Sequence, residues 1–238
     1  MASDGDLNVG ISSQSELTQF VTQKRQTGIY LSVLGFGTGN YRDSKMETLA
    51  DNGNGVYYYI DGMSEAEKVF GSDLLGTLYT VAQDVKLQVT FDPAYISSYR
   101  LIGYENRILN QEDFEDDTKD AGDVGAGHRV TVCYEMTLTE LASSAQAPWL
   151  QLEVRHKEPG SAVSTPRSYD IGANHYTREI DGEMRFICAV IQTVMLLHNS
   201  RYAANTTLAG IAENLSAMDL TAYPDRAEFR DLILQLAG

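Results

Sequence analysis

The chain has 238 residues, of which 43% are apolar and 21% are charged, and its formal net charge is −15. This length is sufficient for one large core or two small ones, and we expect two domains. The apolar fraction indicates a globular protein rather than a disordered one. An acidic surface repels phosphate backbones and anionic lipids, so the composition argues against nucleic-acid binding. A solvated acidic face explains the charge most simply, and attraction of divalent cations or of a basic partner is the alternative.

A strand–helix–strand pattern dominates the first part of the chain. The almost unbroken apolar run 29–36 predicts a strand buried on both faces. Apolar residues at helical spacing around 46–50 predict a short helix, and residues 56–60 predict a second strand beside the first. Such a crossover is typical of parallel sheets.

Two further helices are expected in this part. Ser13 and Glu16 form a capping box at the start of the first, and Ser64 and Glu67 form another, which predicts a long helix with apolar residues as far as Val81. Residues 1–83 therefore alternate helix and strand, which predicts an α/β domain.

The periodicity changes to strand-like alternation after this point. We expect an antiparallel β-sandwich-like domain over residues 84–172, followed by packed helices over residues 183–238, an α+β arrangement. The helix near 183–198 is apolar nearly all round, which predicts a buried position for it. The remaining expected elements are strands at 85–91, 99–108, 130–138 and 149–156, a weaker strand at 168–171, and helices at 207–218 and 224–236.

The cysteines and the apolar stretches exclude several kinds of protein. Cys133 and Cys188 lie far apart in no metal-binding spacing, and two packed free thiols are favoured over a disulfide. The longest apolar helix, 186–197, is too short to cross a bilayer and contains Gln192. We therefore expect no membrane insertion.

An acidic run at residues 112–123 holds seven carboxylates. A solvated hairpin loop is favoured over a cation site there, because Thr118 stands where a calcium loop requires glycine. The glycines between Gly35 and Gly39 follow a strand, but Asn40 replaces the third glycine of a dinucleotide-binding motif, so we interpret them as a tight turn. The histidines form no recognised catalytic motif. No catalytic or cofactor-binding residue is therefore assigned.

Several segments together resemble one family. They read SDGDLNVG, LGFGTGNYRDSKMETLADNGNGVYYYID, TLYTVAQDVKLQVTF, YRLIGYENRIL and DAGDVGAGHRVTVCYEM. These segments are similar to bacterial von Willebrand factor type A domain proteins of the YfbK-like group, including the group's own carboxyl-terminal domain. The resemblance implies that residues 1–83 are the carboxyl-terminal half of a doubly wound von Willebrand A fold, which the chain enters after its middle.

The resemblance also implies an incomplete metal site. In the family, an Asp-x-Ser-x-Ser loop, a threonine and an aspartate from a third loop bind a divalent ion. Asp4 matches that aspartate, but no Asp-x-Ser-x-Ser occurs in this sequence. One carboxylate loop is a poor magnesium site, so no metal ligand is expected, and Mg²⁺ or Ca²⁺ would bind only with the missing half present.

The sequence therefore predicts a non-enzymatic protein-interaction module of the adhesion type with an unidentified protein partner. The family suggests the bacterial cell envelope or periplasm. A strand edge at 29–36 would either pair with a second copy of the chain or be covered by the chain's own amino-terminal segment. The alternatives are a calcium-binding surface protein and a hydrolase that uses the acidic run and His128.

Overall fold

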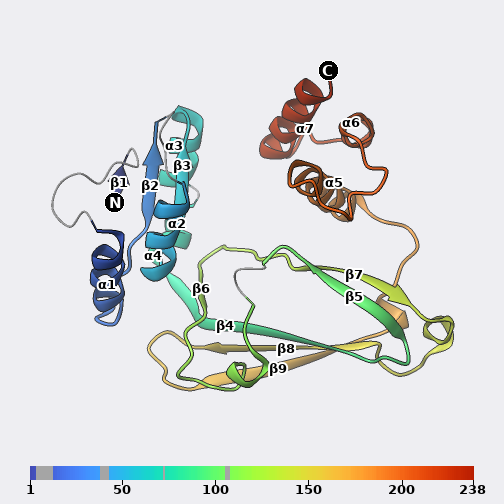
Figure 1. The fold of residues 1–238 in the computed structure, drawn as a ribbon, viewed down its shortest axis with the longest axis horizontal. Coiled ribbons are helices and arrows are strands. Elements are labelled where there is room, and N and C mark those ends of the chain that lie inside the picture. The colour runs from blue at the N-terminus through green and yellow to red at the C-terminus, as the bar shows by residue number, and fades with distance from the viewer. Residues whose placement is uncertain (4–12, 38–42, 72, 105–107) are drawn as a thin grey trace.

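A computed structural model of the chain describes residues 1–3, 13–37, 43–71, 73–104 and 108–238. A small parallel sheet with helices comes first, an antiparallel part follows, and a group of helices ends the chain (Figure 1). This order confirms the fold class that the sequence predicts.

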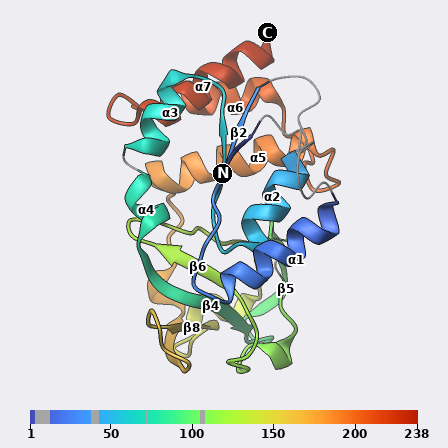
Figure 2. The ribbon, with the colours of Figure 1, turned by 90° about the vertical axis from the view of Figure 1, so that its left-hand side faces the viewer.

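The parallel sheet has helices on both faces. Its strands lie in the order β1 (Ala2–Ser3), β2 (Val33–Phe36), β3 (Tyr57–Ile60). The helices α1 (Gln14–Arg25) and α2 (Asp43–Asn52) lie on one side, and α3 (Met63–Phe70) lies on the other (Figure 2). The core under α1 and α2 consists of Val21, Val33, Met46, Leu49 and Ala50.

The strand predicted at 29–36 is shorter than expected and lies inside the sheet. Residues 29–32 are outside β2, and Ile29 is 59% exposed. One edge of β2 pairs with β3, and the other pairs with β1, where Ala2 lies opposite Leu34. The edge is thus covered by the chain's own amino-terminal segment, which is the second of the two predicted arrangements.

The long helix predicted from 64 onward is wrong. The helix α3 begins at Met63, after Gly62 rather than at the expected capping box, and ends before Gly71. A Cβ on Gly71 would lie 2.5 Å from the Glu67 carbonyl oxygen, so the chain turns where only glycine fits. The next helix, α4 (Leu74–Leu78), is a single short turn, and a strand follows it directly.

Within the residues that the structure describes, six strands form the antiparallel part. They are β4 (Thr80–Phe91), β5 (Ile96–Ile102), β6 (Gly122–Gly125), β7 (Cys133–Leu138), β8 (Leu150–Lys157) and β9 (Ser164–Ile171). One sheet has the order β6-β4-β8-β9, and β5 pairs with β7 in a second sheet. The two sheets meet where the Phe91 ring stacks on Tyr99 at 3.9 Å and meets Tyr134 edge-on at 5.3 Å. A core around Ile96, Ala142, Trp149 and Leu150 closes this end.

The strands differ from the predictions in detail. The strand β6 was not expected, and β5 begins and ends earlier than the predicted strand at 99–108. Along β4 the predicted alternation fails in the middle, because Lys86 is 4% exposed whereas Leu87 is 48% exposed. Lys86 is covered by the acidic segment that contains Asp113 and Asp116. Short 3-10 helices occur at η2 (Gln111–Asp113), η3 (Glu140–Ser144) and η4 (Ala173–His175).

Three helices close the chain: α5 (Gly182–Leu197), α6 (Leu208–Ser216) and α7 (Pro224–Ala237). The side chains of Asp181 and Thr207 cap α5 and α6 by accepting backbone N–H bonds. The buried position predicted for the whole of α5 is wrong, because Leu197 is 63% exposed. Only one side of α5 contributes to the core with α6 and α7, which contains Ala189, Ile211, Ala212, Leu215 and Ile233. None of the helices in the described ranges has the length and apolar character needed to span a membrane.

Candidate functional site

The acidic segment, residues 112–123, lies folded against β4 and is held there by a buried lysine. The Lys86 Nζ donates hydrogen bonds to the carbonyl oxygens of Asp113 and Asp116, at 3.1 and 2.5 Å. Hydrogen bonds from the Thr118 hydroxyl and N–H to the Asp116 carboxylate lower the pKa of Asp116. The carboxylates of this part of the segment thus remain exposed or half-exposed, while its backbone is tied to β4.

A second lysine, Lys157 of β8, holds the middle of the segment. The Lys157 Nζ donates to the Asp84 carboxylate and, at 2.7 Å, to the Asp117 carbonyl oxygen. The Asp117 carboxylate in turn accepts the Ser164 N–H of β9 at 3.3 Å. The segment is thereby tied to three strands of the sheet.

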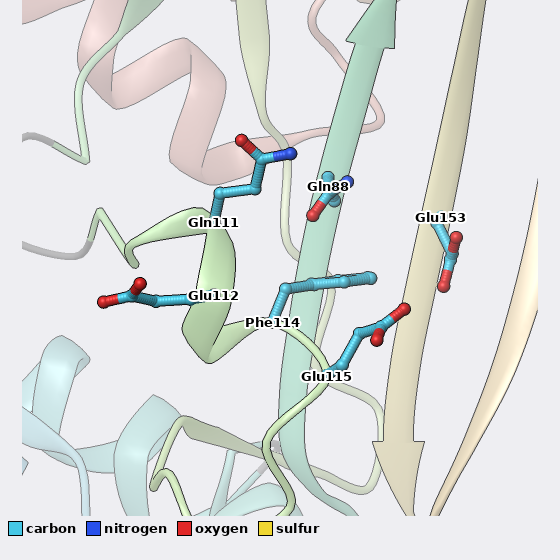
Figure 3. Close-up of a pocket in the computed structure, with 6 residues that line it drawn as sticks. All are labelled: Gln88, Gln111, Glu112, Phe114, Glu115 and Glu153. Atoms are coloured by element: carbon cyan, nitrogen blue, oxygen red, sulfur yellow. The ribbon is translucent and has the colours of Figure 1, made fainter.

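A polar cavity of about 450 Å³ lies between this segment and the sheet. Figure 3 shows the Phe114 ring pointing toward β4, with the Glu115 and Glu153 carboxylates on one side of it. Phe114 is itself buried, and the Arg155 guanidinium lies 5.7 Å from its ring centre. Gln88, Gln111 and Glu112 complete the lining. The carboxylates and amides give the cavity the polarity that suits cations and hydrogen-bond donors.

A polar junction joins the α/β part to the antiparallel part. The Arg25 guanidinium donates to the Asp120 carboxylate at 2.7 Å and to the Asn54 side-chain oxygen at 3.2 Å. The Asn54 amide donates to one oxygen of Asp123 at 3.4 Å, and the backbone N–H of Asp84 donates to the other at 3.1 Å. The acidic segment therefore bonds to both parts of the molecule.

Burial raises the pKa values of Asp120 and Asp123 at this junction, and the Arg25 charge opposes the shift at Asp120. The pKa of the Asp123 carboxyl is higher in the folded protein than its usual value of 3.8. The negative charge of Asp123 therefore destabilises the fold at neutral pH. That cost disappears as the pH falls through the raised value toward about 4.

We expect Asp123→Asn to change the pH dependence of stability. The variant carries no charge at this position, so its free energy of unfolding, relative to the wild type, should be higher at pH 7 than at pH 4. Urea unfolding at both pH values measures the difference. Asp170→Asn, at an exposed position on β9, is the control and should give the same difference at both. An equal difference for Asp123→Asn at both pH values would contradict the expectation.

The histidines lie on four different elements. His128 follows β6 and lies near Gly76 of α4, and His156 on β8 lies 3.6 Å from Glu158. His175 of η4 accepts the Gly172 N–H at 3.3 Å, and His198 is the C-cap of α5. The structure does not gather them into one site.

No group of three or more His, Cys, Asp or Glu side chains in the described part of the chain is placed to hold a metal ion. Asp4, the position that matches the family's aspartate, lies outside the described residues. The glycine turn after β2 is described only as far as Gly37, which has a φ of 101°, a conformation that suits a tight turn.

An exposed apolar surface runs along α3, α4 and the residue that follows. We define it by five side chains that are each between 55% and 75% exposed: Met63, Phe70, Leu75, Leu78 and Tyr79. Met63 and Phe70 are seven residues apart and share one side of α3. The sequence analysis expected Phe70, Leu75 and Leu78 to point inward from a long helix, so the surface was not predicted.

The sequence analysis also missed the roles of Arg25 and Lys86. Arg25 is the last residue of α1, where a basic side chain is normally explained by its favourable interaction with the negative end of the helix dipole. Lys86 falls at a polar position of an alternating strand, which normally faces solvent. The only sequence feature that pointed to these roles of Arg25 and Lys86 was the acidic run, because its negative charges favour positively charged partners.

Comparison with known proteins places most of the chain in one family. Residues 76–237 match the model of the family described as "Uncharacterized protein YfbK, C-terminal". The chain belongs to this family. The resemblance to the YfbK-like group that the sequence indicates is thus confirmed, and the match covers β4 to β9 and the three closing helices, together with the end of α4.

A curated relative covers nearly the whole chain. The "Uncharacterized protein YfbK" of Escherichia coli (strain K12) is 38% identical over 252 aligned positions, which include 98% of this chain. The chain spans 43% of that relative's length. A solved structure, "von Willebrand factor type A from Catenulispora acidiphila", is 15% identical and covers 91% of this chain and 48% of its own, with a TM-score of 0.42.

Proposed function

We propose that this chain is a non-enzymatic protein-interaction module of the adhesion type. The observation that carries the proposal is the apolar surface on α3 and α4, where five large side chains face solvent. Large apolar side chains that face solvent on two successive helices are candidates for burial when proteins associate. The partner is another protein or a second copy of the chain.

The distribution of the chemical groups supports a binding role over a catalytic one. The histidines lie on separate elements. Backbone carbonyl oxygens of the acidic segment accept hydrogen bonds from Lys86 and Lys157. The Asp120 carboxylate bonds to Arg25, and the Asp123 carboxylate accepts the Asp84 N–H. A hydrolase would require titratable side chains that converge on one reacting atom.

Substitution of the apolar surface tests this proposal. We expect Leu75→Ser combined with Leu78→Ser to weaken binding of the partner about tenfold or more, since both side chains would be buried on association. The partner is first captured from a bacterial envelope extract on the immobilised chain, then purified and titrated by interferometry. Light scattering of the purified chain measures self-association in the same way.

Val163→Ser is the matched control, because Val163 is 68% exposed but lies just before β9, away from this surface in the sequence. It should bind with the wild-type dissociation constant. A partner that binds the double variant as tightly as the wild type, or the failure of any protein to bind saturably, would refute the proposal.

A further inference from the structure

Cys133 lies on the face of the β5–β7 sheet that is turned away from β4. In the register of this sheet, Cys133 is opposite Ile102, and Arg100 lies two residues further along β5. Side chains alternate between faces, so Cys133 and Arg100 project from the same face. The neighbouring residue Tyr134 projects from the opposite face, where its ring meets Phe91 of β4.

The helix α5 lies over this same face. Figure 1 shows α5 on the side of β5 and β7 opposite to β4 and β8. The Arg100 side chain reaches that region, with its Nη2 atom 3.9 Å from the Met195 sulfur of α5. Its guanidinium also lies 3.9 Å from the centre of the Tyr202 ring, just beyond the end of α5.

Cys188 is on the side of α5 that faces the sheet. It precedes Met195 by seven residues, which is two helical turns, so the two side chains share one side of the helix. Met195 faces Arg100 on the sheet. Cys188 lies on the same side of α5 and therefore faces the side of the sheet from which Cys133 projects.

The pKa of Cys133 depends on its burial and on Cys188. Burial raises the pKa of Cys133, and the negative charge that Cys188 would carry as a thiolate raises it further. Both cysteines are half-buried free thiols in this structure, and they are the only cysteines in the sequence.

We propose that Cys133 and Cys188 form a reversible intrachain disulfide that ties α5 to β7. The oxidant is a low-molecular-weight disulfide such as oxidised glutathione. One cysteine thiolate attacks this disulfide and releases one glutathione thiolate, and the second cysteine thiolate then attacks the mixed disulfide and releases the other. Each released thiolate takes up one of the two protons that the cysteines lose, and the two cysteine sulfurs together lose two electrons. The bond connects the closing helices to the antiparallel part.

Incubation of the purified full chain with oxidised glutathione at pH 8 tests the proposal. Peptide mass spectrometry should find Cys133 bonded to Cys188, and both thiols should resist alkylation until dithiothreitol is added. The bond closes a long loop of the unfolded chain, so we expect the melting temperature to rise by about 5–10 °C. Formation should be slower at pH 6.5, where less thiolate is present.

Cys133→Ser and Cys188→Ser are the matched controls. Each should keep one thiol that accepts a single glutathione, and each should lose the temperature shift between oxidised and reduced protein. A native wild-type chain that instead carries glutathione on both cysteines, or that keeps two alkylatable thiols in excess oxidant, would overturn the proposal. A disulfide that forms only in denaturant would do the same.

Discussion

Replacement of Lys86 by methionine is expected to lower the free energy of unfolding by about 2–4 kcal/mol. Methionine preserves most of the buried volume but donates no hydrogen bonds. The carbonyl oxygens of Asp113 and Asp116 would lose the ammonium group that they share. Urea unfolding measures the loss of stability, and limited proteolysis should show earlier cleavage between residues 109 and 121.

Lys119→Met provides the control within the same segment. Lys119 forms an ion pair with Asp113 at 3.1 Å, but about half of its side chain is exposed. Exposed ion pairs contribute little, so this variant should unfold at nearly the same urea concentration as the wild type. If both variants lose equal stability, burial of Lys86 is not what holds the acidic segment.

Gly125→Ala should destabilise the chain by about 3 kcal/mol, because β6 and α4 approach each other too closely there for any side chain. A Cβ on Gly125 would lie 1.7 Å from the carbonyl oxygen of Gly76 and 2.6 Å from its carbonyl carbon. These are backbone atoms, so relief requires α4 and β6 to separate. Thermal and urea unfolding measure the effect, and the contact between α4 and the strand should be lost first.

The same strand contains its own control. Gly122 has no heavy atom within 4 Å of a built Cβ, so Gly122→Ala should be nearly neutral. Equal destabilisation by the two substitutions would show that glycine backbone freedom, rather than the close approach to Gly76, sets the requirement.

The sequence correctly predicted the helix and strand ends that are determined by residues close to them in the chain. Ser13 caps α1, Pro224 begins α7, and β8 starts within one residue of its predicted position. These outcomes depend on capping, on proline geometry and on a uniform apolar pattern. They need no knowledge of distant segments.

The patterns failed where a distant segment decides the outcome. Residues 74–81 are apolar at helical spacing, yet Gly71 ends the helix and pairing with β6 draws residues from Thr80 onward into a strand. Lys86 has the polarity of a surface residue, and only the acidic segment, whose Asp113 and Asp116 carbonyls accept its hydrogen bonds, makes burial favourable. Tertiary contacts thus override local propensity at both places.

The candidate site was predictable only in its composition. The acidic run was visible in the sequence, but its partners Arg25 and Lys157 are far from it along the chain. Three residues of the apolar surface, Phe70, Leu75 and Leu78, were expected to point inward, because the pattern shows which residues share a side of a helix and not what covers that side.

The register of β4 has a consequence for the order in which the chain folds. Residues 83–91 of this strand pair with residues 150–157 of β8. During synthesis, β4 therefore leaves the ribosome long before its main partner exists, whereas β1, β2 and β3 have all emerged once β3 has been made. Pairings between such distant segments form slowly, and an unpaired strand is prone to misassociation in the meantime. The period between the synthesis of β4 and that of β8 is thus when this chain most needs protection by chaperones.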